Sequence, residues 1–167
     1  AVLDRIPASV LHDFQCEVLV IDDASTDATF DAGLAYRASR PELPLTVLRN
    51  ATNQGYGGNQ KLGYRYAVME GYDFVALVHG DGQYAPEELP RLLEPLVGGT
   101  ADAVFGSRMM VPGAARRGGM PFYKLVGNKI LSRTQNALAG ARLSEWHSGY
   151  RIYRVSQLEA IRFTANS

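Results

Sequence analysis

The chain has 167 residues, of which 46% are hydrophobic and 20% are charged, so it is long enough for one domain with a sizeable buried core. Its 17 Lys and Arg residues balance its 17 Asp and Glu residues, which argues against attraction of nucleic acid or anionic lipid by overall charge. The single cysteine, Cys16, excludes an internal disulfide. Because no apolar run is long enough to span a bilayer, we expect a reducing, cytoplasmic setting.

The first half of the chain twice repeats the order of apolar strand, polar tip and helix. Residues 17–21 form an apolar run that ends in two aspartates and leads into an amphipathic segment. Residues 45–48 end in an arginine and an asparagine, and a Gly-rich segment then leads into a helical stretch that closes at Gly71.

The second half repeats this order twice more. Residues 74–78 read as a strand buried on both faces, and a helix opens at Pro86 after its polar tip. Residues 101–105 then end in a Gly-Ser-Arg tip. Four such repeats predict an α/β fold with a parallel sheet and right-handed crossovers. The polar tips would all lie at the carboxyl ends of the strands, where open α/β sheets bind ligands.

The tip after residues 74–78 holds the most informative side chain. Asp81 lies between Gly80 and Gly82 and is followed by Gln83, a pattern that suits a metal-phosphate site because glycines let a bulky anion approach. The alternative is an ordinary capping turn before Pro86, and this segment alone does not separate the two.

Five motifs in this order resemble family 2 glycosyltransferases, in particular the dolichyl-phosphate mannosyltransferase-like branch. They occupy residues 20–27, 53–58, 80–83, 106–108 and 147–151. The resemblance implies a GT-A fold, which is a Rossmann-like, mostly parallel sheet with helices on both faces. It also implies that residues 1–167 form a single nucleotide-sugar-binding domain, incomplete at both ends and lacking its first strand.

The resemblance implies a donor site for a nucleoside-diphosphate sugar. Asp23 would bond the nucleobase edge, and Asp22 would support the ribose or the turn. Asn53 and Gly80 would belong to the same donor site. The alternative for the acidic pair is that Asp22 or Ser25 caps the next helix, and for Ser25 capping is the favoured reading. Two adjacent carboxylates cost stability unless a positive or hydrogen-donating group lies between them.

The resemblance also implies a cation, Mg²⁺ or Mn²⁺, that bridges the donor phosphates. Asp81 would be its ligand, with Gln83 as a further oxygen donor. The family usually carries a carboxylate where His79 stands. As a ligand, His79 would favour Mn²⁺, although a hydrogen-bonded structural role is the commoner one for such a histidine.

By the same resemblance, Arg108 would bind the pyrophosphate or an acceptor phosphate, because its guanidinium donors form a rigid fork. The loop of residues 107–119, with Arg116 and Arg117, would act as a mobile lid. Glu145 would hold the acceptor or act as a base. For Trp146 and Tyr150, contact with sugar or lipid competes with core packing, and core packing is the commoner role.

The implied reaction is an inverting transfer of the sugar to an acceptor, with a polyprenyl phosphate at the membrane surface as the candidate. Such a phosphate is already ionised at neutral pH, so no strong base is required. Two rivals stay open. A receiver domain shares the early acidic pair and later aspartate, although the spacing looks too long and no Lys-Pro follows. A sugar nucleotidyltransferase shares the sheet, nucleotide and metal, although its Gly- and Arg-rich first loop is not in this chain.

Overall fold

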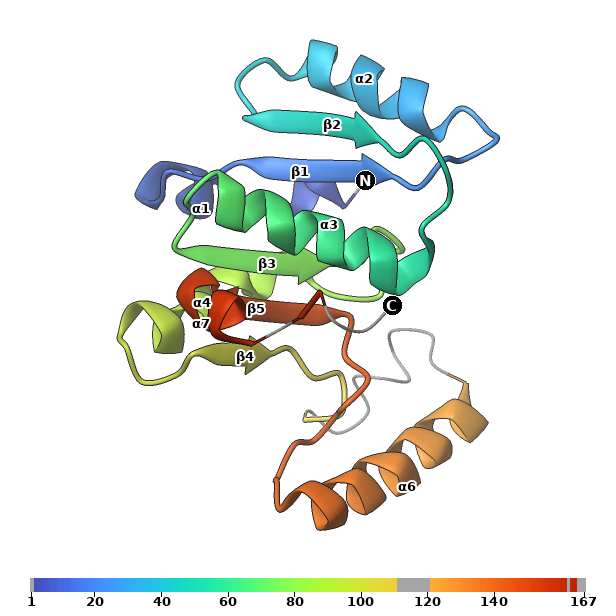
Figure 1. The fold of residues 1–167 in the computed structure, drawn as a ribbon, viewed down its shortest axis with the longest axis vertical. Helices are drawn as coiled ribbons and strands as arrows, with labels where there is room; N and C mark the ends of the chain where they lie inside the picture. The colour runs from blue at the N-terminus through green and yellow to red at the C-terminus, as the bar shows by residue number, and fades with distance from the viewer. Residues whose placement is uncertain (1, 111–120, 162, 165–167) are drawn as a thin grey trace. The chain divides into compact units, whose positions relative to one another are not determined.

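A computed structural model describes residues 2–110, 121–161, 163 and 164, and shows an α/β fold (Figure 1). The chain divides into two compact units. The first unit comprises residues 1–6 and 76–153, and the second comprises residues 7–75 and 154–167. The expected lid, with Arg116 and Arg117, lies mostly outside the described residues.

The second unit is built on a two-stranded parallel sheet. Strand β1 (Val18–Asp22) pairs with β2 (Leu45–Arg49) in a register that places Val18 opposite Leu45 and Asp22 opposite Arg49. The short helix α1 (Ala8–Asp13) precedes β1, and α2 (Thr29–Ser39) packs on both strands. Helix α3 (Gly55–Met69) contacts β1 and α7 (Val155–Ala160). The polar tips of β1 and β2 therefore lie at the same edge, as predicted.

At the opposite end of β1, the carboxylate of Glu17 is the centre of a hydrogen-bonded cluster, the Glu17 cluster. Glu17 accepts hydrogen bonds from the hydroxyl groups of Thr46, Tyr66 and Tyr72, and the Tyr72 bond is 2.6 Å long. Partial burial opposes ionisation of Glu17, but these hydrogen bonds lower its pKa overall. The hydrogen bond to Glu17, together with burial, raises the pKa of Tyr72 to about 12.

The first unit is built on a three-stranded sheet in the order β3-β5-β4. These strands are β3 (Phe74–Val78), β4 (Ala103–Phe105) and β5 (Tyr150–Arg154). The 3-10 helices η1 (Leu3–Arg5) and η2 (Pro86–Glu88) also belong to this unit, and α4 (Leu89–Val97) contacts β4 and η2. The 18-residue helix α6 (Phe122–Ala139) follows β4 along the chain.

Strand β5 runs antiparallel to β4, with Val104 opposite Ile152, which is compatible with the expected mostly parallel sheet. One detail of the prediction was wrong. Residues 74–78 are not buried on both faces, because four of them are half-buried and Ala76 is exposed. An apolar run predicts a strand whose side chains favour burial, but the actual burial depends on which elements pack against each face of the strand. None of the described helices is both long and apolar enough to cross a membrane.

Candidate functional site

In the second unit, the end of β1 places two adjacent carboxylates in different surroundings. Asp22 is only 4% exposed, and its Oδ2 accepts a 3.1 Å hydrogen bond from the backbone N–H of Ser25. The guanidinium of Arg49, opposite it on β2, lies 3.3 Å away. Asp22 therefore stabilises the turn, as one interpretation held, and Ser25 does not cap α2, which begins at Thr29. The Oδ1 atom of Asp22 is buried without a hydrogen-bond partner among the described residues.

Asp23 lies at the centre of an amide cluster. Its Oδ1 accepts hydrogen bonds from the Asn50 side chain (2.7 Å) and from the backbone N–H of Gln54 (2.8 Å). The side-chain amide of Asn53 donates a hydrogen bond to the carbonyl oxygen of Asp23 (3.2 Å). Two residues that were predicted to bind the nucleoside-diphosphate sugar therefore lie together. The N–H of Gln54, followed by the Asn50 amide, lowers the pKa of Asp23 and keeps it ionised. These hydrogen-bond donors, together with the guanidinium of Arg49, offset the repulsion expected between the carboxylates of Asp22 and Asp23.

Sequence reasoning missed part of this cluster. Asn50 also donates to Asn59, whose own amide donates to the carbonyl oxygen of Ile21. Asn50 follows β2 directly, and its place at a strand end was the signal that could have identified it. Between the carboxylates and α2, Ala24 adopts a left-handed backbone with φ 59, which is rare for a residue with a β-carbon. The turn is therefore held in an uncommon conformation by its hydrogen bonds.

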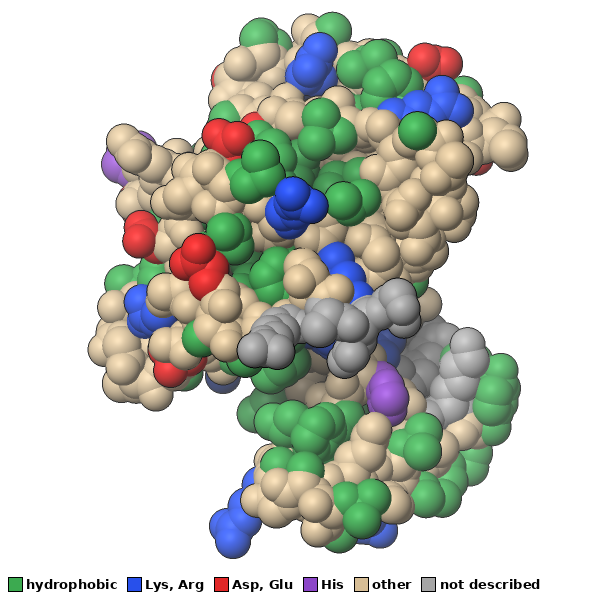
Figure 2. All heavy atoms as spheres, viewed as in Figure 1, with side chains coloured by type: hydrophobic (Ala, Val, Ile, Leu, Met, Phe, Trp, Pro, Cys, Tyr) green, Lys and Arg blue, Asp and Glu red, His purple; other side chains and the backbone are tan. Residues whose placement is uncertain are grey.

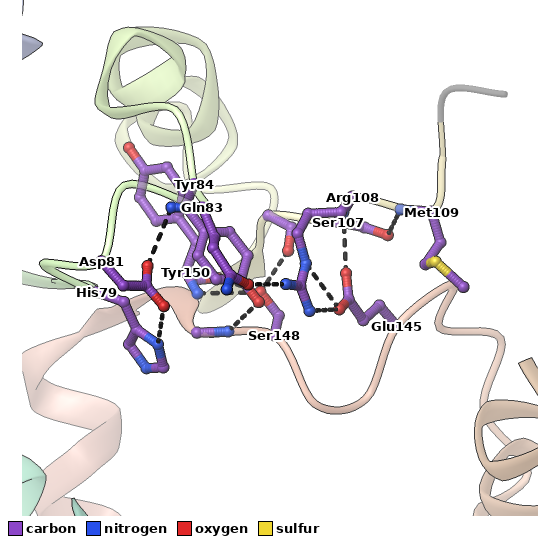
Figure 3. A network of polar contacts seen from close by, with 12 residues as sticks. His79, Asp81, Gln83, Tyr84, Ser107, Arg108, Met109, Glu145, Ser148 and Tyr150 are labelled. Carbon is purple, nitrogen blue, oxygen red and sulfur yellow. Dashed lines mark hydrogen bonds and ion pairs between the residues drawn. The ribbon is translucent and has the colours of Figure 1, made fainter. Parts of the chain in front are cut away.

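In the first unit, the polar residues after β3 form a tight turn. The Oδ1 atom of Asp81 accepts a 3.0 Å hydrogen bond from the N–H of Gln83, and Gly82 between them has φ 75. His79 Nδ1 lies 4.0 Å from Asp81 Oδ2 (Figure 3). Both Gly80 and Asp81 are exposed, so the carboxylate is accessible to a ligand.

Arg108 is held by a buried partner. Glu145, with a side chain 1% exposed, accepts hydrogen bonds from Nε and Nη2 of Arg108 and from its backbone N–H (2.9 Å). The Nη1 atom of Arg108 donates to Gln83 Oε1 at 2.8 Å, and the guanidinium lies 4.6 Å above the Tyr84 ring. Figure 3 shows this arginine between the two side chains that accept its hydrogen bonds. The structure thus brings together three predicted site residues, Gln83, Arg108 and Glu145.

A second layer supports this arginine. The Tyr84 hydroxyl accepts a 2.7 Å hydrogen bond from the N–H of Gly149, and burial raises the pKa of Tyr84. Tyr150 is 2% exposed and meets Tyr84 edge to face, so core packing is confirmed for Tyr150. Trp146 donates to Asn136 of α6. Tyr84 and Asn136 carry no motif signal and were missed for that reason.

The residues expected to hold a cation fit only in part. His79 and Asp81 approach each other, whereas the Gln83 oxygen is directed at the guanidinium of Arg108. Within residues 2–110, 121–161, 163 and 164, no group of three or more His, Cys, Asp and Glu could hold a metal ion. Mg²⁺ sites that include substrate phosphates need only one or two carboxylates. Asp81 fits that requirement, and the geometry favours Gln83 as a partner of Arg108.

Comparison with known proteins places these two clusters in context. Residues 1–162 match the profile of the family described as Glycosyl transferase family 2. The chain is 37% identical over 162 residues to the undecaprenyl-phosphate mannosyltransferase of Micrococcus luteus, covering 97% of the chain and 61% of that protein. It is 33% identical over 151 residues to the polyprenol monophosphomannose synthase of Mycolicibacterium smegmatis, covering 90% of the chain and 56% of that protein. The chain thus spans about three fifths of the length of these curated relatives.

Proposed function

This chain is a member of glycosyl transferase family 2, and on that premise we propose that it supplies the donor-binding part of an enzyme that glycosylates a polyprenyl phosphate. The sugar would be transferred from a nucleoside-diphosphate sugar. The names of two relatives, an undecaprenyl-phosphate mannosyltransferase and a polyprenol monophosphomannose synthase, support this acceptor class. A third, from Methanococcus voltae and 25% identical, is named for transfer of N-acetylglucosamine to dolichyl phosphate. The acceptor class is therefore better supported than the identity of the sugar.

The observation that carries the proposal is the fixed orientation of Arg108. Of its five N–H donors, one each on Nε, Nη1 and Nη2 is bonded to Glu145 or Gln83. One further donor on each of Nη1 and Nη2 has no hydrogen-bond partner within residues 2–110 and 121–161. Two parallel donors on a planar guanidinium match a phosphate group. Because its carboxylate is buried against Arg108, Glu145 is a positioning residue in this proposal and not a base.

Each cluster, taken by itself, offers groups that suit one part of a nucleoside-diphosphate sugar. We infer that the Asp23 cluster binds the nucleoside, because an ionised carboxylate and several amides offer both acceptors and donors to a base or ribose. Asp81 would bind Mg²⁺ or Mn²⁺ jointly with the diphosphate, and such a cation, when bound, neutralises charge on the leaving group. Arg108 stabilises phosphate charge from its own side.

The chemistry then needs no proton acceptor in the protein. An oxygen of the acceptor phosphate attacks the anomeric carbon, and the bond from that carbon to the diphosphate breaks, which inverts the configuration. A phosphate monoester has a second pKa near ~6 and is already ionised at neutral pH. The role of the chain is therefore to orient donor and acceptor and to stabilise charge.

A transfer assay tests the proposal. The protein is incubated with radiolabelled nucleoside-diphosphate sugars and either a short-chain polyprenyl phosphate or the matching polyprenol. We expect label on the phosphate and none on the alcohol, and a loss of at least ~tenfold for Glu145→Gln. Arg91→Lys, at an exposed position on α4, should leave the rate unchanged. Transfer to the alcohol would contradict the proposal, and pyrophosphate release from a nucleoside triphosphate would favour a nucleotidyltransferase instead.

A further inference from the structure

Polar contacts hold the last turns of α6 to the rest of its unit. A surface helix is normally attached by an apolar stripe that faces inward. In α6, however, Phe122, Val126 and Ile130 are 65%, 39% and 59% exposed. Figure 2 shows hydrophobic side chains gathered over this helix. Its less exposed residues include Ser132, which is buried, and Asn136, which is half-buried, so hydrogen bonds contribute much of the attachment.

The backbone of Asn136 ties the end of α6 to the residues that follow. Its carbonyl oxygen accepts hydrogen bonds from the N–H groups of Gly140 and Ala141, the latter at 3.1 Å. Gly140 adopts a left-handed backbone with φ 62, which is a common way for a helix to end. The chain therefore leaves α6 in a direction that the carbonyl of Asn136 helps to fix.

The side chain of Asn136 extends this connection by three hydrogen bonds. Its amide N–H donates to the carbonyl oxygen of Leu143 (2.8 Å). Its Oδ1 atom accepts the N–H of Leu143 (2.9 Å) and the indole N–H of Trp146 (2.8 Å). Both lone pairs of Oδ1 are thus used. Asparagine is a poor helix former, so these bonds give a physical reason for its presence near the end of α6.

These bonds enclose Glu145 on both sides. Residues 141–149 form neither helix nor strand, so their conformation depends on specific contacts. Leu143 lies just before Glu145 and Trp146 directly follows it, and both are bonded to Asn136. The carboxylate of Glu145, 1% exposed, in turn accepts hydrogen bonds from Nε, Nη2 and the backbone N–H of Arg108 (Figure 3).

We propose that Asn136 is a positioning residue for Arg108. It holds residues 140–146 in place, these hold Glu145, and Glu145 sets the direction of the guanidinium. This inference rests on the proposed function, because two parallel donors serve phosphate binding only when they point in one fixed direction. Without the Asn136 amide, the ion pair of Arg108 and Glu145 would persist but would move as a unit, and phosphate charge would be stabilised less well.

The proton on Nε of Arg108 provides a readout that needs no substrate. It is bonded to Glu145 Oε1 at 3.2 Å, and its NMR signal is identified by its loss in Arg108→Lys. We expect this proton to exchange with water at least ~fivefold faster in Asn136→Ala, because the segment that carries Glu145 opens more often. The backbone N–H groups of β5 serve as the reference, since a general loss of stability would accelerate their exchange equally.

Thr134→Ala is the matched control in the same helix. Thr134 is exposed, and its hydroxyl donates to the carbonyl oxygen of Ile130 within α6. The substitution therefore removes a polar side chain from this part of α6 without touching residues 140–146. We expect it to leave the exchange of the Arg108 proton unchanged.

A double-mutant cycle on sugar transfer tests the route from Asn136 to the reaction. Asn136→Ala should lower kcat/KM at least ~fivefold in the wild-type background. In the Arg108→Lys background it should cause no further loss, because the fork on which it acts is absent. Thr134→Ala should have no effect in either background. Losses that multiply would show that Asn136 acts by a route other than Arg108, and would overturn the proposal.

Trp146→Phe decides the question where Asn136→Ala does not fold, as judged by far-UV circular dichroism and the thermal midpoint. It keeps both bonds between Asn136 and Leu143 and removes only the indole bond beside Glu145. We expect the Arg108 proton to exchange at least ~twofold faster than in the wild type. Exchange at the wild-type rate in every folded variant would overturn the proposal.

The two readouts separate this proposal from the proposed function. A wild-type protein that transfers no sugar to a polyprenyl phosphate would refute the proposed function, and the exchange of the Arg108 proton would still decide whether Asn136 positions this arginine. Wild-type transfer together with unchanged exchange in the variants would refute positioning and leave the function intact. Faster exchange with unaltered transfer would also overturn the proposal, because the orientation of Arg108 would then not matter to the reaction.

Discussion

The imidazole ring of His79 lies directly against the backbone of Gly149, so that a β-carbon at position 149 would stand 2.5 Å from its Cε1 atom. His79 also meets the ring of Tyr84 edge to face, and the hydroxyl of Tyr84 accepts the N–H of Gly149. His79 therefore packs against the loop that carries Glu145. A packing role accounts for His79 without metal ligation.

Gly149→Ala should destabilise the protein, because the new methyl group forces the His79 ring out of its position. We expect a cost of about 1–3 kcal/mol in thermal or denaturant unfolding. In a His79→Ala background the same substitution should cost much less, since the obstructing ring is gone. Gly57→Ala, at a helical position where the added carbon meets no described atom within 4 Å beyond its chain neighbours and its own helix backbone, should be neutral or slightly stabilising. Equal costs in both backgrounds would show that the two residues are not coupled.

Asp81→Asn should abolish the metal-dependent part of nucleoside diphosphate binding, because it removes the only charge we assign to the cation. Gln83→Ala should weaken binding less, since its oxygen contacts Arg108, and His79→Ala should matter least. Isothermal titration calorimetry with and without Mn²⁺ measures the three effects. Asp31→Asn, at an exposed position on α2, serves as the control. Metal-independent binding in the wild type would rule out a cation at Asp81.

Arg108→Lys should lower transfer at least ~tenfold while the protein stays folded, because an ammonium keeps the charge but cannot reproduce the fork to Glu145 and Gln83. Glu145→Ala should instead lower stability by about 3–5 kcal/mol, since it leaves a largely buried guanidinium without its carboxylate. Turnover and thermal midpoint, measured on both variants, separate the two effects. Wild-type turnover in Arg108→Lys would show that the guanidinium of Arg108 has no special role in phosphate binding.

Glu17→Gln should remove a stabilising contribution that depends on pH. The pKa of Glu17 is lowered in the folded state, so its stabilisation is present above the unfolded pKa near ~4.3 and is lost as pH falls through the folded pKa. The variant should therefore melt a few degrees below wild type at pH 7, and the two should converge as pH falls through the folded pKa of Glu17. Glu42→Gln, which alters an exposed carboxylate paired with Arg40, should have little effect at either pH.

The hydrogen bond between Glu17 and Tyr72 can also be tested without unfolding the protein, by following the ionisation of Tyr72 in its absorbance spectrum. In the wild type the Tyr72 phenol, whose pKa is raised to about 12, should ionise late in an alkaline absorbance titration. In Glu17→Gln it should ionise earlier, since the neighbouring negative charge is absent. An unchanged titration would show that the carboxylate does not bond this phenol in solution.

The strand ends could be predicted from sequence because apolar runs and polar tips are local patterns. Asp22 ends a strand, and Asp23, Asp81 and Arg108 come after strands, as expected. Strand β5 was not predicted, and its antiparallel direction depends on pairing with a strand more than forty residues away.

The site was harder to read than the strands. The contact of Arg108 with Glu145 joins residues 37 positions apart, and the motif that contains each residue does not specify its partner.

The Glu17 cluster has a consequence for folding kinetics. Its hydrogen-bond donors Thr46, Tyr66 and Tyr72 lie 29, 49 and 55 residues farther along the chain. The bonds can form only once β1, β2 and α3 have come together, so they report on the docking of segments that are distant along the chain. An interaction made after the transition state acts on the unfolding rate, and one made before it acts on the folding rate. The changes that Glu17→Gln causes in the two rates therefore date this docking relative to the transition state.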